Sequence, residues 1–225
     1  SPIMSNPSPS KQQICEEMYK SYHAKFPDIP TLTSVEYLQT ISSSSSPSPS
    51  PSPSPSPSSN NYILVDVRSK PEQNVSMIPD SITLPEFETR MKDTSNNVDP
   101  DQTVVTYCTI GYRSGLEARR IRDVYHMKVL NLDGIVNYTH ACSAMKREGN
   151  DGGGILLQEP RTRKSTRRVH VFGPAWNVAS EDFETGFFST FDMATKGMGV
   201  GFKACMGGTK RVVRRLCGPC CRRER

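Results

Sequence analysis

Four apolar runs along the chain predict β-strands, covering residues 62–68, 82–85, 103–107 and 129–132. The first is the strongest, because nearly every residue up to Asp66 is apolar, as in a strand covered on both faces of a parallel sheet. Apolar residues at helical spacing predict helices over residues 11–25, 33–41, 87–92 and 114–126. Strands that alternate with helices predict an α/β fold, with a parallel central sheet and helices on both faces.

The helix predicted over residues 114–126 has a broad apolar side. The residues expected to face the core are Leu116, Ala118, Ile121, Val124 and Tyr125. The charged residues Arg119, Arg122 and Asp123 are expected on the opposite, solvated side.

Low-complexity segments and changes in composition divide the chain. Residues 1–31 are expected to form a disordered start and one helix, and residues 32–140 an α/β domain. A Ser/Pro insertion at about residues 42–60 lies within that domain, and no packed element can be built from it. Residues 141–196 are expected to form an aromatic-rich C-terminal extension and residues 197–225 a flexible, basic tail.

The extension contains two further apolar runs. Residues 155–157 and 168–173 are expected to pair as a hairpin around a basic loop. The aromatic residues expected to pack onto the domain are Trp176, Phe183, Phe187, Phe188 and Phe191.

The positive charge of the chain is concentrated at its C-terminal end. The chain of 225 residues has a formal net charge of +5 and a mean hydropathy of −0.54. Residues 210–225 alone hold seven Lys or Arg and one Glu, so the basic balance belongs to the tail and indicates little about the folded part.

Seven cysteines, an odd number with irregular spacing, do not fit a disulfide framework. We therefore expect a reducing intracellular compartment, the cytoplasm or an organelle. Because the sequence starts at Ser1 without an initiator methionine, the lack of a targeting signal carries little weight.

Cys108 lies between a predicted strand and a predicted helix. The sequence from Thr103 to Tyr107 is a β-branched run, and a short turn with Gly111 follows the cysteine. Backbone N–H groups of the turn and the helix dipole point at a sulfur in this position and favour the thiolate. Arg113 adds a fixed positive charge. Cys108 is therefore the candidate nucleophile, with a buried structural cysteine as the alternative.

Four features together resemble the rhodanese family. They are Asp66-Val67-Arg68, the loop from Cys108 to Arg113, the helix that starts at Arg113-Ser114, and Leu132-Asp133-Gly134-Ile135 followed by Tyr138. The sequence departs from the family at Ser76-Met77, where Gly-His is usual, at Tyr138, where Trp is common, and at the Ser/Pro run. These departures affect the scaffold and leave the loop unchanged.

The resemblance implies a sulfurtransferase that needs no cofactor or metal. Cys108 would take a sulfane sulfur from thiosulfate or a persulfide and pass it to cyanide or a thiol such as glutathione or a thioredoxin-like protein. The loop Thr109, Ile110, Gly111, Tyr112 and Arg113 would hold the persulfide with its N–H groups. Arg113 would orient an anionic donor or hold the loop closed. Asp66 and Arg68 are expected to support the scaffold, as a buried carboxylate and an ion pair with an acid such as Glu72.

Two other functions stay open. Cysteine phosphatases and arsenate reductases with a similar fold carry a Cys-x5-Arg loop, whereas this loop has four residues between Cys108 and Arg113. The shorter loop favours binding of a sulfur atom over binding of a tetrahedral phosphate or arsenate. No carboxylate is marked by position as a general acid. The other alternative is a docking or regulatory module without catalysis. Because Arg113 stands nearly alone as a cation, we expect the physiological donor or acceptor to be a larger thiol or persulfide, glutathione-based or on a protein.

The remaining cysteines have several interpretations. Cys142 is expected to be structural, with a resolving thiol or internal sulfur acceptor as the alternative. Cys217, Cys220 and Cys221 lie among arginines and are expected to be exposed thiols of a flexible tail. Redox activity, a metal site completed by Cys205, and acylation beside a polybasic stretch are the alternatives. The tail could thus contact a membrane surface. No nucleic acid is expected, since no aromatic platform accompanies the tail.

Overall fold

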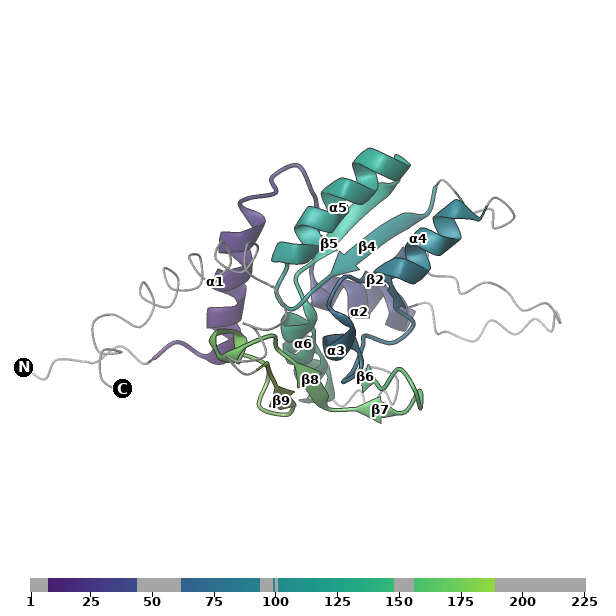
Figure 1. Cartoon of the computed structure of the whole chain (residues 1–225). Helices are drawn as coiled ribbons and strands as arrows, with labels where there is room; N and C mark the ends of the chain where they lie inside the picture. The colour runs from purple at the N-terminus through teal and green to yellow at the C-terminus, as the bar shows by residue number, and fades with distance from the viewer. Residues whose placement is uncertain (1–7, 44–61, 94–98, 100, 148–155, 189–225) are drawn as a thin grey trace, which may run out of the picture.

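The structure, a computed structural model shown in Figure 1, describes residues 8–43, 62–93, 99, 101–147 and 156–188. Most of the Ser/Pro insertion and the whole basic tail, with Cys205, Cys217, Cys220 and Cys221, lie outside the described residues, as does Phe191. Within the described part of the chain, no helix is long and apolar enough to cross a membrane.

A parallel sheet forms the centre of the fold, as the sequence predicts, and it has five strands where the sequence predicts four. Its strands are β1 (Thr31–Leu32), β2 (Tyr62–Asp66), β3 (Ile82–Thr83), β4 (Thr103–Tyr107) and β5 (Lys128–Leu132). The spatial order is β1-β5-β4-β2-β3, which makes β4 the central strand. The loop that starts at Cys108 therefore leaves the middle of the sheet at its carboxyl edge, the usual place for a site in a parallel sheet.

In the described residues, six α-helices surround the sheet. They are α1 (Lys11–His23), α2 (Ser34–Ser43), α3 (Lys70–Gln73), α4 (Leu84–Lys92), α5 (Tyr112–Tyr125) and α6 (Ile135–Arg147). The first is capped by Ser10, whose side chain accepts the Gln13 N–H while the Gln13 side chain accepts the Ser10 N–H. Thr83 and Glu86 form the same reciprocal cap on α4. The sequence therefore fixes these helix starts locally.

Alternating side chains of the strands build two cores. Val65, Val104 and Val129 face α4 and α5, whose Phe87, Ala118 and Ile121 complete one cluster. Leu64, Val105 and Leu132 face the other way, into a larger cluster with α1, α2 and α6. Helices thus lie on both faces of the sheet (Figure 1), as predicted.

The buried side of α5 differs from the prediction at two positions. Ser114, Gly115, Ala118 and Ile121 are buried, whereas Leu116 is 47 % exposed and Val124 is 56 % exposed. At about 100° per residue, the two apolar residues point away from the buried stripe. Gly115 belongs to that stripe because the Phe26 ring packs against it, leaving no room for a Cβ.

The extension packs onto the domain through α6. The predicted hairpin is wrong in its second strand: β6 (Leu157–Gln158) pairs with β7 (Ser165–Thr166), and β8 (Arg168–His170) pairs in parallel with β9 (Glu184–Gly186). The chain turns back early, between Gln158 and Ser165, which leaves β8 for a later partner.

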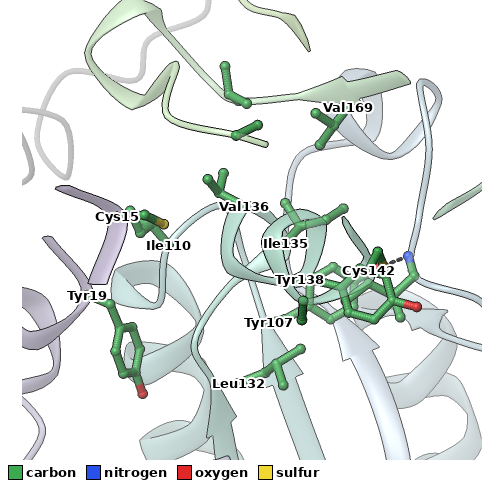
Figure 2. Packing of buried hydrophobic residues seen from close by; sticks show 14 of the residues in the cluster. Cys15, Tyr19, Tyr107, Ile110, Leu132, Ile135, Val136, Tyr138, Cys142 and Val169 are labelled. Carbon is green, nitrogen blue, oxygen red and sulfur yellow. Dashed lines mark hydrogen bonds between the residues drawn. The ribbon is translucent and has the colours of Figure 1, made fainter. Parts of the chain in front are cut away.

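Aromatic packing in the extension agrees with the prediction except at Phe187, which is 45 % exposed and does not pack onto the domain. Trp176 and Phe183 are buried in the same cluster as α6, and Figure 2 shows Val169 of β8 near Ile135 and Val136 of α6. Phe188 is also buried, with its ring against those of His170 and Phe172. The helix α6 runs across the predicted domain boundary at residue 140, so the extension shares the core of the α/β domain.

Candidate functional site: the loop from Cys108 to Arg113

Two donors contact the Cys108 sulfur. The Gly111 N–H donates to Sγ at 3.2 Å, and the Ser114 hydroxyl lies 3.4 Å from it. The cysteine is only 2 % exposed, and Ser114 is fully buried. The structure thus places the predicted nucleophile among donors, and it adds Ser114, which the sequence did not mark as a site residue.

Gly111 enables this geometry. Its φ is +92°, in the left-handed region, and a Cβ there would lie 2.4 Å from the Tyr19 ring of α1. The Asn131 side-chain amide of β5 donates to the Gly111 carbonyl at 2.9 Å. Only glycine suits both the backbone angle and the close approach of α1.

The first turn of α6 holds the other side of the loop. The N–H groups of Ile135 and Val136 donate to the carbonyls of Cys108 at 2.9 Å and Thr109 at 3.3 Å. Gly134, with φ +106°, lets this turn approach, since a Cβ there would lie 2.6 Å from Cα of Ile110. The Gly134 landmark of the sequence therefore serves the loop directly.

Two apolar side chains of the loop, Ile110 and Tyr112, pack into the hydrophobic cores. Ile110 is buried in the larger core, beside Cys15 of α1 in Figure 2. The Tyr112 ring packs against the rings of Tyr22 and Phe26 at 5.8 and 5.7 Å. What the loop offers to the sulfur is its backbone, as the sequence suggests, and Gly111 provides the N–H that bonds it.

Arg113 is bound by Glu72 of α3. Its Nη1 and Nη2 donate to the two carboxylate oxygens at 2.8 and 2.7 Å, and Nη2 also donates to Thr109 Oγ1 at 3.0 Å. The Ser69 N–H and hydroxyl donate to the same carboxylate at 2.9 and 2.6 Å, so Glu72 both caps α3 and fixes the loop. Of the two roles predicted for Arg113, the contacts support holding the loop closed.

Because Glu72 binds Arg113, the expectation that Arg68 pairs with Glu72 is wrong. Arg68 pairs with Asp66 itself, through Nε at 3.0 Å and Nη2 at 2.7 Å, and both side chains are fully buried. Tyr107 donates its hydroxyl to Asp66 at 2.7 Å, and Arg68 donates to the Ser76 carbonyl at 2.6 Å. Asp66 and Arg68 are only two residues apart on the strand end, which leaves Glu72 available for Arg113. The scaffold role predicted for both residues fits these contacts.

The pKa of Glu72 yields a prediction for acid stability. Although burial raises this pKa, Arg113 and the hydrogen bonds lower it from 4.5 to about 2. The carboxylate therefore contributes stability that is fully present above pH 4.5 and lost as the pH falls toward 2. Between about pH 6 and pH 2.5 the wild type should lose about 2–3 kcal/mol more than Glu72→Gln. Urea unfolding across this range measures the difference, and parallel curves for the two proteins would contradict it.

The other described cysteines are poor nucleophiles. Burial raises the pKa of Cys142 to about 12, and burial together with Asp133 raises that of Cys15 well above its ordinary value. Cys142 thus fits the structural role predicted for it. Among the side chains that the structure places, no group of three or more His, Cys, Asp or Glu is arranged to hold a metal ion.

The protein has a parallel α/β domain in which a loop beginning with a cysteine follows the central strand. The family model of the Rhodanese-like domain matches residues 56–139. This chain therefore contains a rhodanese-like domain. No curated protein matches it.

Several solved structures are similar. A thiosulfate sulfurtransferase from Pseudomonas aeruginosa is 17 % identical with a TM-score of 0.43, over 68 % of this chain and 24 % of that one. A polysulfide-sulfur transferase from Wolinella succinogenes is 17 % identical with a TM-score of 0.33, over 60 % and 89 %. A Rhodopseudomonas palustris protein described as a possible tyrosine phosphatase is 21 % identical with a TM-score of 0.34, over 59 % and 90 %. The chain spans about a quarter of the Pseudomonas protein.

Proposed function

We propose that this protein is a sulfurtransferase that carries a sulfane sulfur on Cys108. The observation that supports this most is the pair of donors, Gly111 N–H and the Ser114 hydroxyl, on the Cys108 sulfur. Donors at this position can stabilise the negative charge of a persulfide formed on Cys108. The loop of four residues between Cys108 and Arg113 is in keeping with a cradle for one sulfur atom.

The reaction has two displacements. The Cys108 thiolate attacks the outer sulfur of the donor, an S–S bond forms at Sγ, and the donor's own S–S bond breaks. The donor remainder, sulfite or a thiolate, leaves with the electron pair. An acceptor, cyanide or a thiolate, then attacks the outer sulfur, and Cys108 leaves as a thiolate. The low exposure of Cys108 would limit hydrolysis and oxidation of the persulfide between the two steps.

The charges at the site favour a persulfide donor over thiosulfate. Arg113 is neutralised by Glu72 and Arg68 by Asp66, so neither arginine offers an unpaired charge to a small dianion. We therefore propose a larger donor, such as glutathione persulfide. The same contacts argue against phosphatase chemistry, because the low pKa of Glu72 leaves this carboxylate without a proton to give at neutral pH.

The test compares donors with cyanide as the acceptor and thiocyanate as the measured product. We expect transfer from both donors, with a higher kcat/KM for glutathione persulfide than for thiosulfate. Thiosulfate far ahead of the persulfide would overturn the donor assignment alone. No transfer from either donor in folded protein would favour the docking module, and phosphate release from an aryl phosphate would favour the phosphatase.

A further inference from the structure

Phe172 brings the extension into contact with the Cys108 loop. This residue follows β8, outside the family match over residues 56–139. The centre of its ring lies 4.8 Å from the guanidinium carbon of Arg113, which is a cation–π distance. The face of the loop arginine is thus covered by a segment that lies outside the residues matched by the family model.

The backbone of Phe172 is held in an unfavourable conformation. Its φ is +68°, in the left-handed region that bulky residues avoid. The Phe172 N–H donates to Nδ1 of His170 at 3.1 Å, and its carbonyl accepts the Phe188 N–H at 3.2 Å. The ring meets Trp176 and Phe188 edge to face at 5.4 and 5.8 Å. Strain maintained by this many contacts indicates a role for the orientation of the ring.

The ring acts where the Arg113–Glu72 pair would otherwise meet water. The Glu72 side chain is fully buried, whereas that of Arg113 is 29 % exposed. An aromatic face over the guanidinium attracts the cation and excludes water, and both effects favour the pairing of Arg113 with Glu72. Since Nη2 of Arg113 also binds Thr109, the paired arginine fixes the loop next to Cys108.

We propose that Phe172 is a positioning residue, which holds Arg113 on Glu72 and thereby keeps the Cys108 loop in its sulfur-binding conformation. The extension then contributes a positioning residue to the candidate site. The effect of Phe172 on catalysis rests on the proposed sulfurtransferase function. The effect on the loop itself does not depend on any reaction.

Hydrogen exchange in the full chain tests the effect on the loop. We expect the amides of residues 108–115 to exchange about tenfold faster in Phe172→Leu, which removes the aromatic face, since a cation–π contact of ordinary strength supports that change in opening. Phe172→Gly relieves the backbone strain but lacks the ring, so it should open the loop as well. Phe172→Tyr keeps the ring and should match the wild type.

Phe183→Leu is the matched control. Phe183 is also a buried aromatic of the extension, and its ring lies 5.8 Å from the guanidinium of Arg167, whereas that of Phe172 lies against Arg113 of the loop. This variant should leave exchange at residues 108–115 unchanged. Equal exchange in Phe172→Leu and Phe183→Leu, or wild-type exchange in Phe172→Leu, would overturn the proposal.

Kinetics separates this inference from the proposed function. In Phe172→Leu the turnover with thiosulfate and with glutathione persulfide should fall by the same factor, about tenfold, because the ring acts through the loop. A loss with one donor only would indicate that Phe172 contacts the donor, and would overturn the positioning role. If the wild type transfers no sulfur while exchange responds as expected, the sulfurtransferase fails and the positioning of the loop stands.

Discussion

Replacement of Cys108 by serine should reduce sulfur transfer by about 1,000-fold or more. The serine hydroxyl is not ionised at neutral pH and cannot form a persulfide, so the covalent route is lost. The fold should stay intact, because serine is slightly smaller than cysteine and the Gly111 N–H and Ser114 hydroxyl can donate to its oxygen instead of to Sγ. Steady-state kcat/KM with glutathione persulfide and cyanide measures the effect.

Cys142→Ala is the control for this variant. Cys142 is buried in the core with α6, and its high pKa makes it a poor nucleophile. The variant should therefore keep the wild-type kcat/KM in folded protein. A Cys108→Ser protein that retains a tenth or more of the activity would show that another group carries the sulfur.

Replacement of Arg68 by methionine should lower the free energy of unfolding by about 3–5 kcal/mol, the cost of breaking a buried ion pair. Asp66 would stay buried with the Tyr107 hydroxyl and the backbone N–H of residue 68, and without the guanidinium. The Ser76 carbonyl would lose its donor too. Urea denaturation measures the change, and kcat of the folded fraction should change little, because the Asp66–Arg68 pair makes no contact with the Cys108 sulfur.

Arg122→Met provides the comparison on the surface. Arg122 pairs with Asp28 and Asp123, and its side chain is 36 % exposed. Because exposed pairs contribute little, this variant should lose less than about 1 kcal/mol. Equal losses in the two variants would show that the buried pair has no special weight in stability.

Local patterns predicted most of the domain. The apolar runs that became β2, β4 and β5 pair over four or five residues each, and their side chains are covered on both faces, which is what a continuous apolar run signals. By contrast, β1 has two residues and follows Pro30, so neither its length nor its pattern distinguishes it from a loop. It exists because β5 offers it a free edge.

In the candidate site too, local sequence predicts some features, and others depend on the packing of distant segments. The position of Cys108, Gly111 and Arg113 in one turn follows from neighbours in sequence. The contacts of Glu72, Tyr19 and Phe172 with that turn depend on how distant segments pack, which no local pattern encodes. The wrong partner for Arg68 has this origin: two acids lay within reach, and only the fold assigned Glu72 to Arg113.

The central claim is that Cys108 carries a sulfur atom between a donor and an acceptor. Mass spectrometry tests it most directly, on the full chain incubated with glutathione persulfide and then mapped by peptides. We expect one added sulfur on the peptide with Cys108, removed by cyanide or a reducing thiol and absent in Cys108→Ser. No added sulfur on that peptide in folded wild-type protein, from this donor or from thiosulfate, would contradict it.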